Sequence, residues 1–201
     1  MKALVTGATR GPGRAMATAL ARAGWEVHAL GRDRVVLEEM RCEQGIIPMA
    51  VDLTDRDFVR NVVDGMNLDL LIHAAQRWPA QARFLEIAEA DIDMALEVNL
   101  SAMLHLSRTV MLSMIGRGRG MVLVAAPRYE EAGSVIERSV AAAARDFALS
   151  VSTELAGTGV SVEHLPLGSA PFDGLAERLL ELVAGAVSPG QATADRAFHE
   201  C

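Results

Sequence analysis

Four residues near the start of the chain have the types and spacing of a phosphate-binding loop. Thr6 and Gly7 follow a short apolar run, and Gly11 and Gly13 come just before a helical pattern. Glycine lets the backbone turn tightly and approach a ligand, and the unpaired N–H groups at the start of a helix attract negative charge. A strand, a glycine loop and a helix in this order are the context of a dinucleotide-binding motif. We therefore expect a nucleotide phosphate here rather than a glycine-rich turn without a ligand.

The spacing Thr6-Gly7-x-x-x-Gly11-x-Gly13 resembles the nucleotide loop of the short-chain dehydrogenase/reductase family. The resemblance covers nearly the whole chain, and it implies a Rossmann-type fold that binds a nicotinamide dinucleotide. One residue departs from the family pattern, because Pro12 has no backbone N–H to donate to the pyrophosphate. The missing charge-assisted bond predicts binding weaker by about 1.5–3 kcal/mol if nothing compensates.

Two arginines predict which nucleotide the loop binds. The second expected strand ends near Gly31, where an NAD-preferring member of the family commonly has an acidic residue for the ribose hydroxyls. Here Arg32 follows that glycine, and Arg10 lies inside the glycine loop. Planar guanidinium groups bind phosphate bidentately, so the resemblance implies NADP as the cofactor. The alternative is that both arginines are solvated surface side chains.

Three further residues match site positions of the family. Asp52 resembles the acidic residue beside the adenine, although capping of the next helix is an equal alternative. In the run from His73 to Gln76, only Ala75 matches the family's Asn-Asn-Ala-Gly motif, and Gln76 is expected to crowd the nicotinamide ribose. Asn99 matches an asparagine that, in the family, kinks a helix and holds a water molecule for proton relay.

The catalytic residues of the family have no counterpart in this sequence. Members use a serine and a Tyr-x-x-x-Lys pair, because the reaction needs a phenol made more acidic by a nearby cation. This chain has one tyrosine, Tyr129, and one lysine, Lys2, which are too far apart to form the motif. Counting back from residues 153–156, which resemble the family's helix end, puts Glu137 in the tyrosine position and Ala141 in the lysine position.

Two hypotheses follow for the function. The first is an NADP(H)-binding protein that is inactive or nearly so by the usual mechanism, and serves as a sensor or a non-catalytic subunit. The second is an NADPH-dependent carbonyl reductase in which Tyr129, Glu137 or His73 has taken over proton transfer. Tyr129 is expected near the mouth of the site, although surface loops often carry such residues without a function. Asn99 and Tyr129 are the candidate catalytic residues, and the fold alone does not decide between the hypotheses.

Alternating apolar runs and helical patterns predict the architecture. Strands are expected at residues 2–6, 26–30, 46–51, 68–73, 121–125 and 160–165. Helices are expected at residues 12–23, 35–44, 55–65, 87–115, 134–156 and 175–186, with Thr54 as the N-cap of the third. This order predicts an α/β fold: a Rossmann-type doubly wound parallel sheet with helices on both faces, in one domain over residues 1–201. The fold is expected to be truncated after the sixth strand, without the family's seventh strand and substrate-covering segment.

Composition narrows the classes of function. A chain of 201 residues with 51% apolar residues can bury a full core, and a net charge of −7 argues against nonspecific nucleic-acid binding. Neither the two cysteines nor the five histidines have the spacing of metal ligands, so no metal is expected. Without a recognisable signal peptide or membrane-spanning run, a cytoplasmic location away from membranes is the expectation.

Two of the expected helices predict self-association, because in the family they pair with their symmetry mates in a four-helix bundle. Small and apolar residues gather on one side of the later helix, at residues 141–144, Ala148, Val151 and Leu155. Apolar residues recur at helical spacing on the earlier helix, at Met103, Leu106, Val110 and Met114. We expect a homo-oligomer (dimer or tetramer) or a heteromer with an active homologue, unless these residues only pack on the sheet.

Overall fold

The computed structural model describes residues 1–80, 83–168, 172 and 174–186. Within these residues, six parallel strands form one sheet in the order β3-β2-β1-β4-β5-β6. The strands are β1 (Lys2–Thr6), β2 (Glu26–Gly31), β3 (Ile47–Ala50), β4 (Leu70–His73), β5 (Gly120–Pro127) and β6 (Val160–Leu167). The expected doubly wound parallel sheet is confirmed. Its strand order reverses between β1 and β4, where open sheets of this kind bind ligands.

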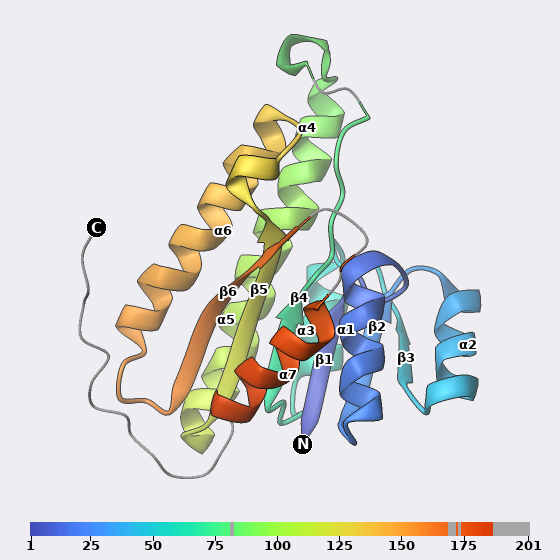
Figure 1. The fold of residues 1–201 in the computed structure, drawn as a ribbon, viewed down its shortest axis with the longest axis vertical. Helices are drawn as coiled ribbons and strands as arrows, with labels where there is room; N and C mark the ends of the chain where they lie inside the picture. The colour runs from blue at the N-terminus through green and yellow to red at the C-terminus, as the bar shows by residue number, and fades with distance from the viewer. Residues whose placement is uncertain (81–82, 169–171, 173, 187–201) are drawn as a thin grey trace.

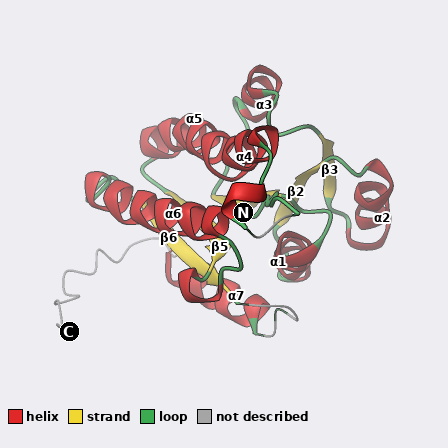
Figure 2. Ribbon diagram, turned by 90° about the horizontal axis from the view of Figure 1, so that it is seen from above, coloured by secondary structure: helices red, strands yellow, loops and turns green. Residues whose placement is uncertain are grey.

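Helices cover both faces of the sheet, as Figures 1 and 2 show. One layer contains α1 (Gly11–Arg22), α2 (Arg34–Gln44) and α7 (Leu175–Ala186). The other contains α3 (Arg56–Val63), α4 (Glu89–Leu96), α5 (Ala102–Arg117) and α6 (Val135–Glu154). A buried apolar cluster lies between the sheet and each layer. The expected helices on both faces are therefore confirmed as well.

The central strands are continuous apolar runs because helices bury both of their faces. Leu70, Leu71 and Ile72 of β4 have no exposed surface, and neither do Leu4 and Val5 of the adjacent β1.

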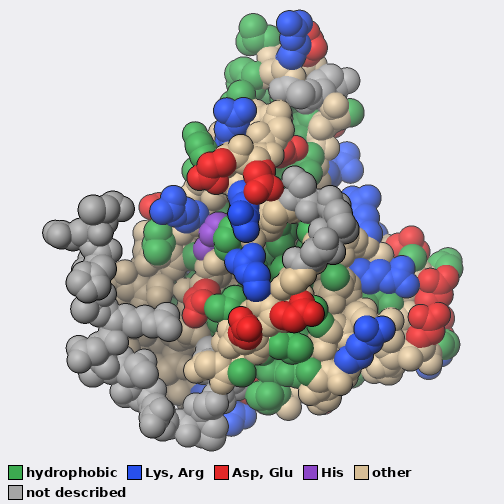
Figure 3. Space-filling view, in the orientation of Figure 1, with side chains coloured by type: hydrophobic (Ala, Val, Ile, Leu, Met, Phe, Trp, Pro, Cys, Tyr) green, Lys and Arg blue, Asp and Glu red, His purple; other side chains and the backbone are tan. Residues whose placement is uncertain are grey.

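On the face shown in Figure 3, acidic and basic side chains of the described residues are interspersed, and acidic groups gather over α2. Among the described residues, no helix is long and apolar enough to cross a membrane, and no His, Cys, Asp and Glu cluster could hold a metal ion.

Two details of the expected elements are wrong. The single helix expected over residues 87–115 is interrupted, because a π-helical turn (Glu97–Ser101) separates α4 from α5. The N-cap of α3 is Asp55 rather than Thr54: its carboxylate accepts a hydrogen bond from the N–H of Phe58 at 3.1 Å. The expected lack of a seventh strand concerns residues 187–201, which lie outside the described residues.

Most apolar residues that suggested association pack inside the protein. The buried ones are Met103, Leu106, Val110, Met114, Ala141, Ala144, Ala148 and Leu155. For this set, packing on the sheet and between neighbouring elements is the correct interpretation. Other large apolar side chains on the same two helices are exposed, namely Leu104, Leu112, Ile115, Val135 and Leu149. These exposed residues are the ones available to a partner.

Candidate functional site

Thr6 joins the end of β1 to the end of β4. Its fully buried hydroxyl oxygen accepts hydrogen bonds from the N–H groups of Ala74 at 3.1 Å and Ala75 at 3.2 Å. Without this acceptor, two amides at a buried strand end would lose their partner. Thr6 therefore fixes the point at which the chain leaves β4, and with it one wall of the site.

The glycines of the loop allow backbone segments to touch. A Cβ atom on Gly7 would lie 2.5 Å from the Cα of Ala75, and one on Gly13 would lie 2.4 Å from the carbonyl oxygen of Gly7. Gly7 and Gly11 also have positive φ values of 64° and 53°, which side chains disfavour. The expected loop is thus a close-packed cradle that any larger residue at Gly7 or Gly13 would fill.

The helix that follows the cradle begins at Gly11, with Pro12 in its first turn. Proline is tolerated there because first-turn N–H groups have no helical partner. It also removes one of the donors that a helix start offers to an anion. Gly11 and Gly13 remain as the backbone donors of this turn.

A wide cleft opens in front of this loop. Six of the eight expected cofactor residues line it, namely Gly7, Arg10, Gly11, Arg32, Asp52 and Ala75. Gly13 is buried beneath Gly7, and Thr6 lines a neighbouring hollow instead. The chain segments after β1, β2, β3 and β4 meet at this cleft, as expected for the carboxyl ends of parallel strands.

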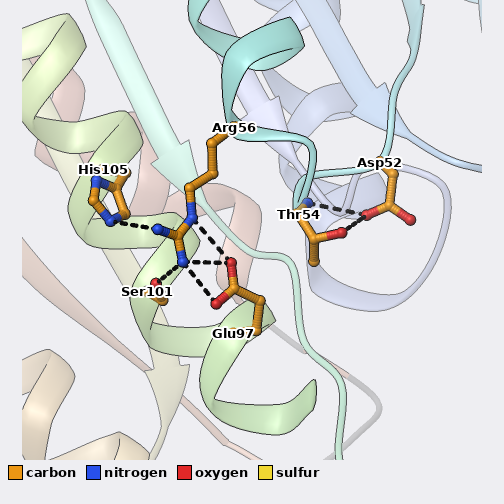
Figure 4. Close-up of polar contacts among 6 residues, drawn as sticks. All are labelled: Asp52, Thr54, Arg56, Glu97, Ser101 and His105. Atoms are coloured by element: carbon orange, nitrogen blue, oxygen red, sulfur yellow. Dashed lines mark hydrogen bonds and ion pairs between the residues drawn. The ribbon is translucent and has the colours of Figure 1, made fainter. Parts of the chain in front are cut away.

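Asp52 stabilises the turn after β3 and does not cap a helix. Its Oδ1 accepts hydrogen bonds from the N–H and the hydroxyl of Thr54, at 3.0 and 2.8 Å (Figure 4). The backbone hydrogen bond is the main reason why the pKa of Asp52 lies below its usual value. Its Oδ2 lies 4.0 Å from Nη1 of Arg32, and both side chains are exposed, so this ion pair is weak.

Position 31 has no space for a side chain in the present arrangement. A Cβ atom on Gly31 would lie 2.6 Å from Cγ2 of Thr9, so an acidic residue there would require Thr9 to move. Arg10 and Arg32 are both exposed at the cleft. The adenosine side of an NAD(P)-type site would therefore face guanidinium groups and the carboxylate of Asp52.

A small inner hollow lies beside the cleft and shares five lining residues with it, namely Leu53, Ala75, Gln76, Trp78 and Val98. β5 and α6 supply apolar walls, from Val124, Ala125, Ala126, Pro127, Val140 and Ala144. His73 is the one titratable side chain of the described lining, and it is buried. Burial lowers the pKa of His73 to about 3, so its imidazole is neutral at neutral pH.

Gln76 presents an unused hydrogen-bond donor between the two hollows. Its Nε2 is buried and has no hydrogen-bond partner among the described residues. Such a group is costly unless a ligand or water supplies an acceptor. Together with the glycine cradle and the cleft arginines, this orphaned amide fits a site built for a polar nucleotide.

Asn99 uses both ends of its side-chain amide on the backbone of Arg77. Its Oδ1 accepts the Arg77 N–H at 2.9 Å, and its Nδ2 donates to the Arg77 carbonyl oxygen at 2.6 Å. Asn99 is buried and lies in the π-helical turn, so the expected irregularity of the helix is present. Its amide therefore positions the segment after β4; a water relay stays a prediction.

Sequence reasoning missed the polar cluster that holds the π-helical turn. The guanidinium of Arg56, at the start of α3, donates to Glu97 at 2.8 Å and to Ser101 at 2.7 Å, and contacts His105 (Figure 4). Glu97, Ser101 and His105 recur every four residues and share one helix face. The four-residue spacing could have indicated that these three side chains share a helix face, but nothing in the sequence identified Arg56 as their partner.

Tyr129 and Asn99 differ in their surroundings, because Asn99 is buried and Tyr129 is exposed. Tyr129 begins a short 3-10 turn (Tyr129–Glu131), is 53% exposed and lines neither hollow. Tyr129 therefore lies outside the lining of both hollows, and a catalytic role for it stays a prediction. Arg128, its neighbour in sequence, forms an ion pair with Glu131 at 3.6 Å.

Glu137, which counting along the sequence puts in the family's tyrosine position, stabilises the start of α6. Ser134 is the N-cap and accepts the N–H of Glu137 at 3.1 Å, while the Glu137 carboxylate accepts the N–H of Gly133 at 2.6 Å. This reciprocal arrangement is close to a capping box. The carboxylate is thereby occupied, and Glu137 lines neither hollow.

Residues 1–171 match the protein family described as short chain dehydrogenase. The chain therefore belongs to this family.

Curated relatives support the assignment. An uncharacterized short-chain type dehydrogenase/reductase from Sinorhizobium fredii is 41% identical over 120 residues, which are 60% of this chain and 48% of that protein. A "Probable NADP-dependent dehydrogenase" from Haemophilus influenzae is 30% identical over 180 residues, 83% of this chain and 70% of that protein. The chain spans about half the length of several curated relatives, among them the L-xylulose reductase of Mus musculus, at 48%.

Solved structures share the fold. A metagenomic short-chain oxidoreductase in complex with NADP has a TM-score of 0.80 and 25% identity, over 90% of this chain and 89% of that one. A short-chain dehydrogenase from Sphingobium yanoikuyae in complex with NADPH has a TM-score of 0.82 and 21% identity, over 92% of this chain and 85% of that one. The second likeness concerns the fold alone.

Proposed function

We propose that this protein binds NADP(H) and does not carry out the usual proton transfer of its family. The cleft in front of the glycine loop supports nucleotide binding, and the family includes a relative named as NADP-dependent and a structure solved with NADP. In a reductase, bound NADPH supplies a hydride to an electrophilic carbon, and that is the step we expect to be missing here.

The binding role rests on a small set of residues. The N–H groups of Gly11 and Gly13 would hold the diphosphate, with Thr6 and Gly7 shaping the loop around it. Arg10 and Arg32 would bind the 2′-phosphate, because guanidinium groups pair with phosphate through two parallel hydrogen bonds. Among the lining residues, Asp52 would lie beside the adenine and Ala75 beside the loop.

The inference that the usual proton transfer is missing rests on the side chains that line the inner hollow. Proton transfer requires a side chain that titrates near the working pH and reaches the substrate. The one titratable group in the described lining is His73, which burial keeps neutral and which contacts Ser107. We therefore infer a sensor or a non-catalytic subunit, acting in the cytoplasm as a homo-oligomer or beside an active homologue.

Calorimetric titration of the purified protein with NADPH and NADH tests the binding role. We expect NADPH to bind more tightly than NADH. A failure of both nucleotides to bind would refute the proposal. A panel of ketones and aldehydes, added with NADPH, tests the second part, and we expect no appreciable turnover.

The names of several relatives favour a second candidate, an active NADPH-dependent carbonyl reductase. The D-erythrulose reductase of Gallus gallus is 39% identical over 119 residues, 58% of this chain. In that case Tyr129, Glu137 or His73 would transfer the proton. Turnover that Tyr129→Phe abolishes would establish this candidate, and turnover that survives it would direct attention to Glu137 and His73.

A further inference from the structure

Arg77 has a fixed backbone and an unused side chain. The amide of Asn99 binds both its N–H and its carbonyl oxygen, at 2.9 and 2.6 Å. Its guanidinium group, in contrast, is exposed and has no hydrogen bond or ion pair among the described residues. Because the backbone of Arg77 is already fixed, anion binding has to order only its side chain, and the guanidinium group is available to a ligand.

The position of Arg77 relates it directly to the glycine loop. Gly7 packs on Ala75, since a Cβ on the glycine would lie 2.5 Å from the Cα of Ala75. Arg77 follows that contact by two residues, and it lines the same cleft as Gly11 and Pro12. Arg77 therefore borders the same cleft as the glycine loop and the start of α1.

The loop itself lacks a donor at this place. Pro12 leaves the first turn of α1 with one N–H fewer than a helix start normally offers. A guanidinium group supplies several N–H donors and a full positive charge, and its bonds to phosphate are strong. The other two cleft arginines are Arg10, which is the N-cap residue of α1, and Arg32, which lies near Asp52 at the end of β2; the proposed function assigns both to the 2′-phosphate.

We propose that Arg77 binds the diphosphate of the nucleotide and replaces the N–H that Pro12 does not have. This inference rests on the proposed NADP(H) binding. It makes a distinct prediction, because the diphosphate is common to NADPH and NADH whereas the 2′-phosphate is not. Loss of Arg77 weakens both nucleotides equally, and loss of Arg32 weakens NADPH alone.

Calorimetric titration of four proteins tests the proposal: the wild type, Arg77→Ala, Arg77→Lys and a control, Arg83→Ala. Arg83 is exposed, pairs with Glu86 at 3.1 Å and does not line the cleft. We expect Arg77→Ala to raise the Kd of both nucleotides about tenfold, consistent with one charge-assisted bond. Arg77→Lys recovers part of the affinity, and Arg83→Ala changes nothing. The melting temperature without nucleotide stays unchanged in Arg77→Ala.

The Pro12→Ala variant shows whether Arg77 replaces the missing N–H or only attracts the diphosphate by its charge. This substitution restores the missing N–H, so Arg77→Ala costs less affinity in the Pro12→Ala background than in the wild type. An equal cost in both backgrounds contradicts the replacement of that N–H by Arg77.

The remaining outcomes distinguish the two proposals. If the wild type binds nucleotides and Arg77→Ala binds them equally well, Arg77 has no such role and the proposed function stands. If Arg77→Ala weakens NADPH alone, Arg77 contacts the 2′-phosphate and the assignment to the diphosphate is wrong. If the wild type binds neither nucleotide, both the proposed function and this inference are refuted.

Discussion

The imidazole of His73 lies against the hydroxyl of Ser107 inside the core, with 2.8 Å between Nε2 and Oγ. His73 is 5% exposed, and Ser107 is fully buried. Burial penalises the charged imidazolium and lowers the pKa of His73 to about 3. At neutral pH this residue is therefore a hydrogen-bonding group of the core rather than an acid catalyst.

The titration of His73 predicts a loss of stability in mild acid. The unfolded chain binds the proton near a pKa of about 6.5, and the folded protein does so only near 3, so the unfolded state holds more protons between these values. The contribution is fully present above about pH 6.5 and is lost as the pH falls towards 3. We expect His73 to account for about 2 kcal/mol between pH 7 and pH 5.

Urea unfolding at both pH values measures this effect. His73→Gln keeps a hydrogen-bonding group but does not titrate, so it should flatten the pH dependence. An unchanged pH dependence in His73→Gln would show that His73 is not the responsible group.

Arg32 is expected to determine the preference for NADPH. Its guanidinium group borders the cleft 4.0 Å from the Asp52 carboxylate, and both groups are exposed, so a phosphate can compete for it. Arg32→Ala should weaken NADPH binding about tenfold and leave NADH binding nearly unchanged. Titration with both nucleotides decides this, and equal affinities of the wild type for the two would contradict it.

Glu137 is expected to matter for stability. Its carboxylate accepts the N–H of Gly133 before α6, so Glu137→Ala should destabilise the protein by about 1 kcal/mol. Glu137→Gln keeps an acceptor and should lose less than half of that. Thermal unfolding of the two variants measures the difference, and equal losses would show that the acceptor oxygen is not the stabilising feature.

Exposed leucines on α5 and α6 are expected to lie in an oligomer interface. Leu112 and Leu149 are 59% and 58% exposed, and burial of such side chains favours association. Light scattering should find a dimer or tetramer, and Leu112→Glu should shift it towards the monomer. Leu85→Glu, on a turn before α4, is the matched control. A monomeric wild type at micromolar concentration would exclude the homo-oligomer and leave a heteromeric partner.

Much of the fold was predictable because its signals are local. Apolar runs predicted all six described strands, and helical spacing predicted the main helices. The spacing of the glycines predicted the loop. The N-cap of α3 was not predictable, because Thr54 and Asp55 are both good N-cap residues and only the backbone geometry selects Asp55. The bounds of the π-helical turn were not predictable, because the helical pattern continues through both flanking helices; only the resemblance of Asn99 to a helix-kinking asparagine indicated an irregularity there.

The site was predictable only in part, because its key contacts join distant residues. Arg56 and Glu97 are 41 positions apart, and Asn99 and Arg77 are 22 apart, so no local pattern connects them. Glu137 illustrates a different difficulty. Counting along the sequence put Glu137 in a catalytic position of the family and suggested proton transfer. In the structure, its hydrogen bonds with Ser134 and Gly133 give Glu137 a role in capping α6.

The central claim is that the protein holds NADPH without transferring its hydride. NADPH fluorescence tests this most directly, with protein and nucleotide at equal concentrations before a panel of ketones and aldehydes is added. The account predicts that the emission changes when NADPH binds and then stays constant after each carbonyl compound is added. A rapid loss of NADPH emission upon addition of a carbonyl compound, absent without protein, would contradict it.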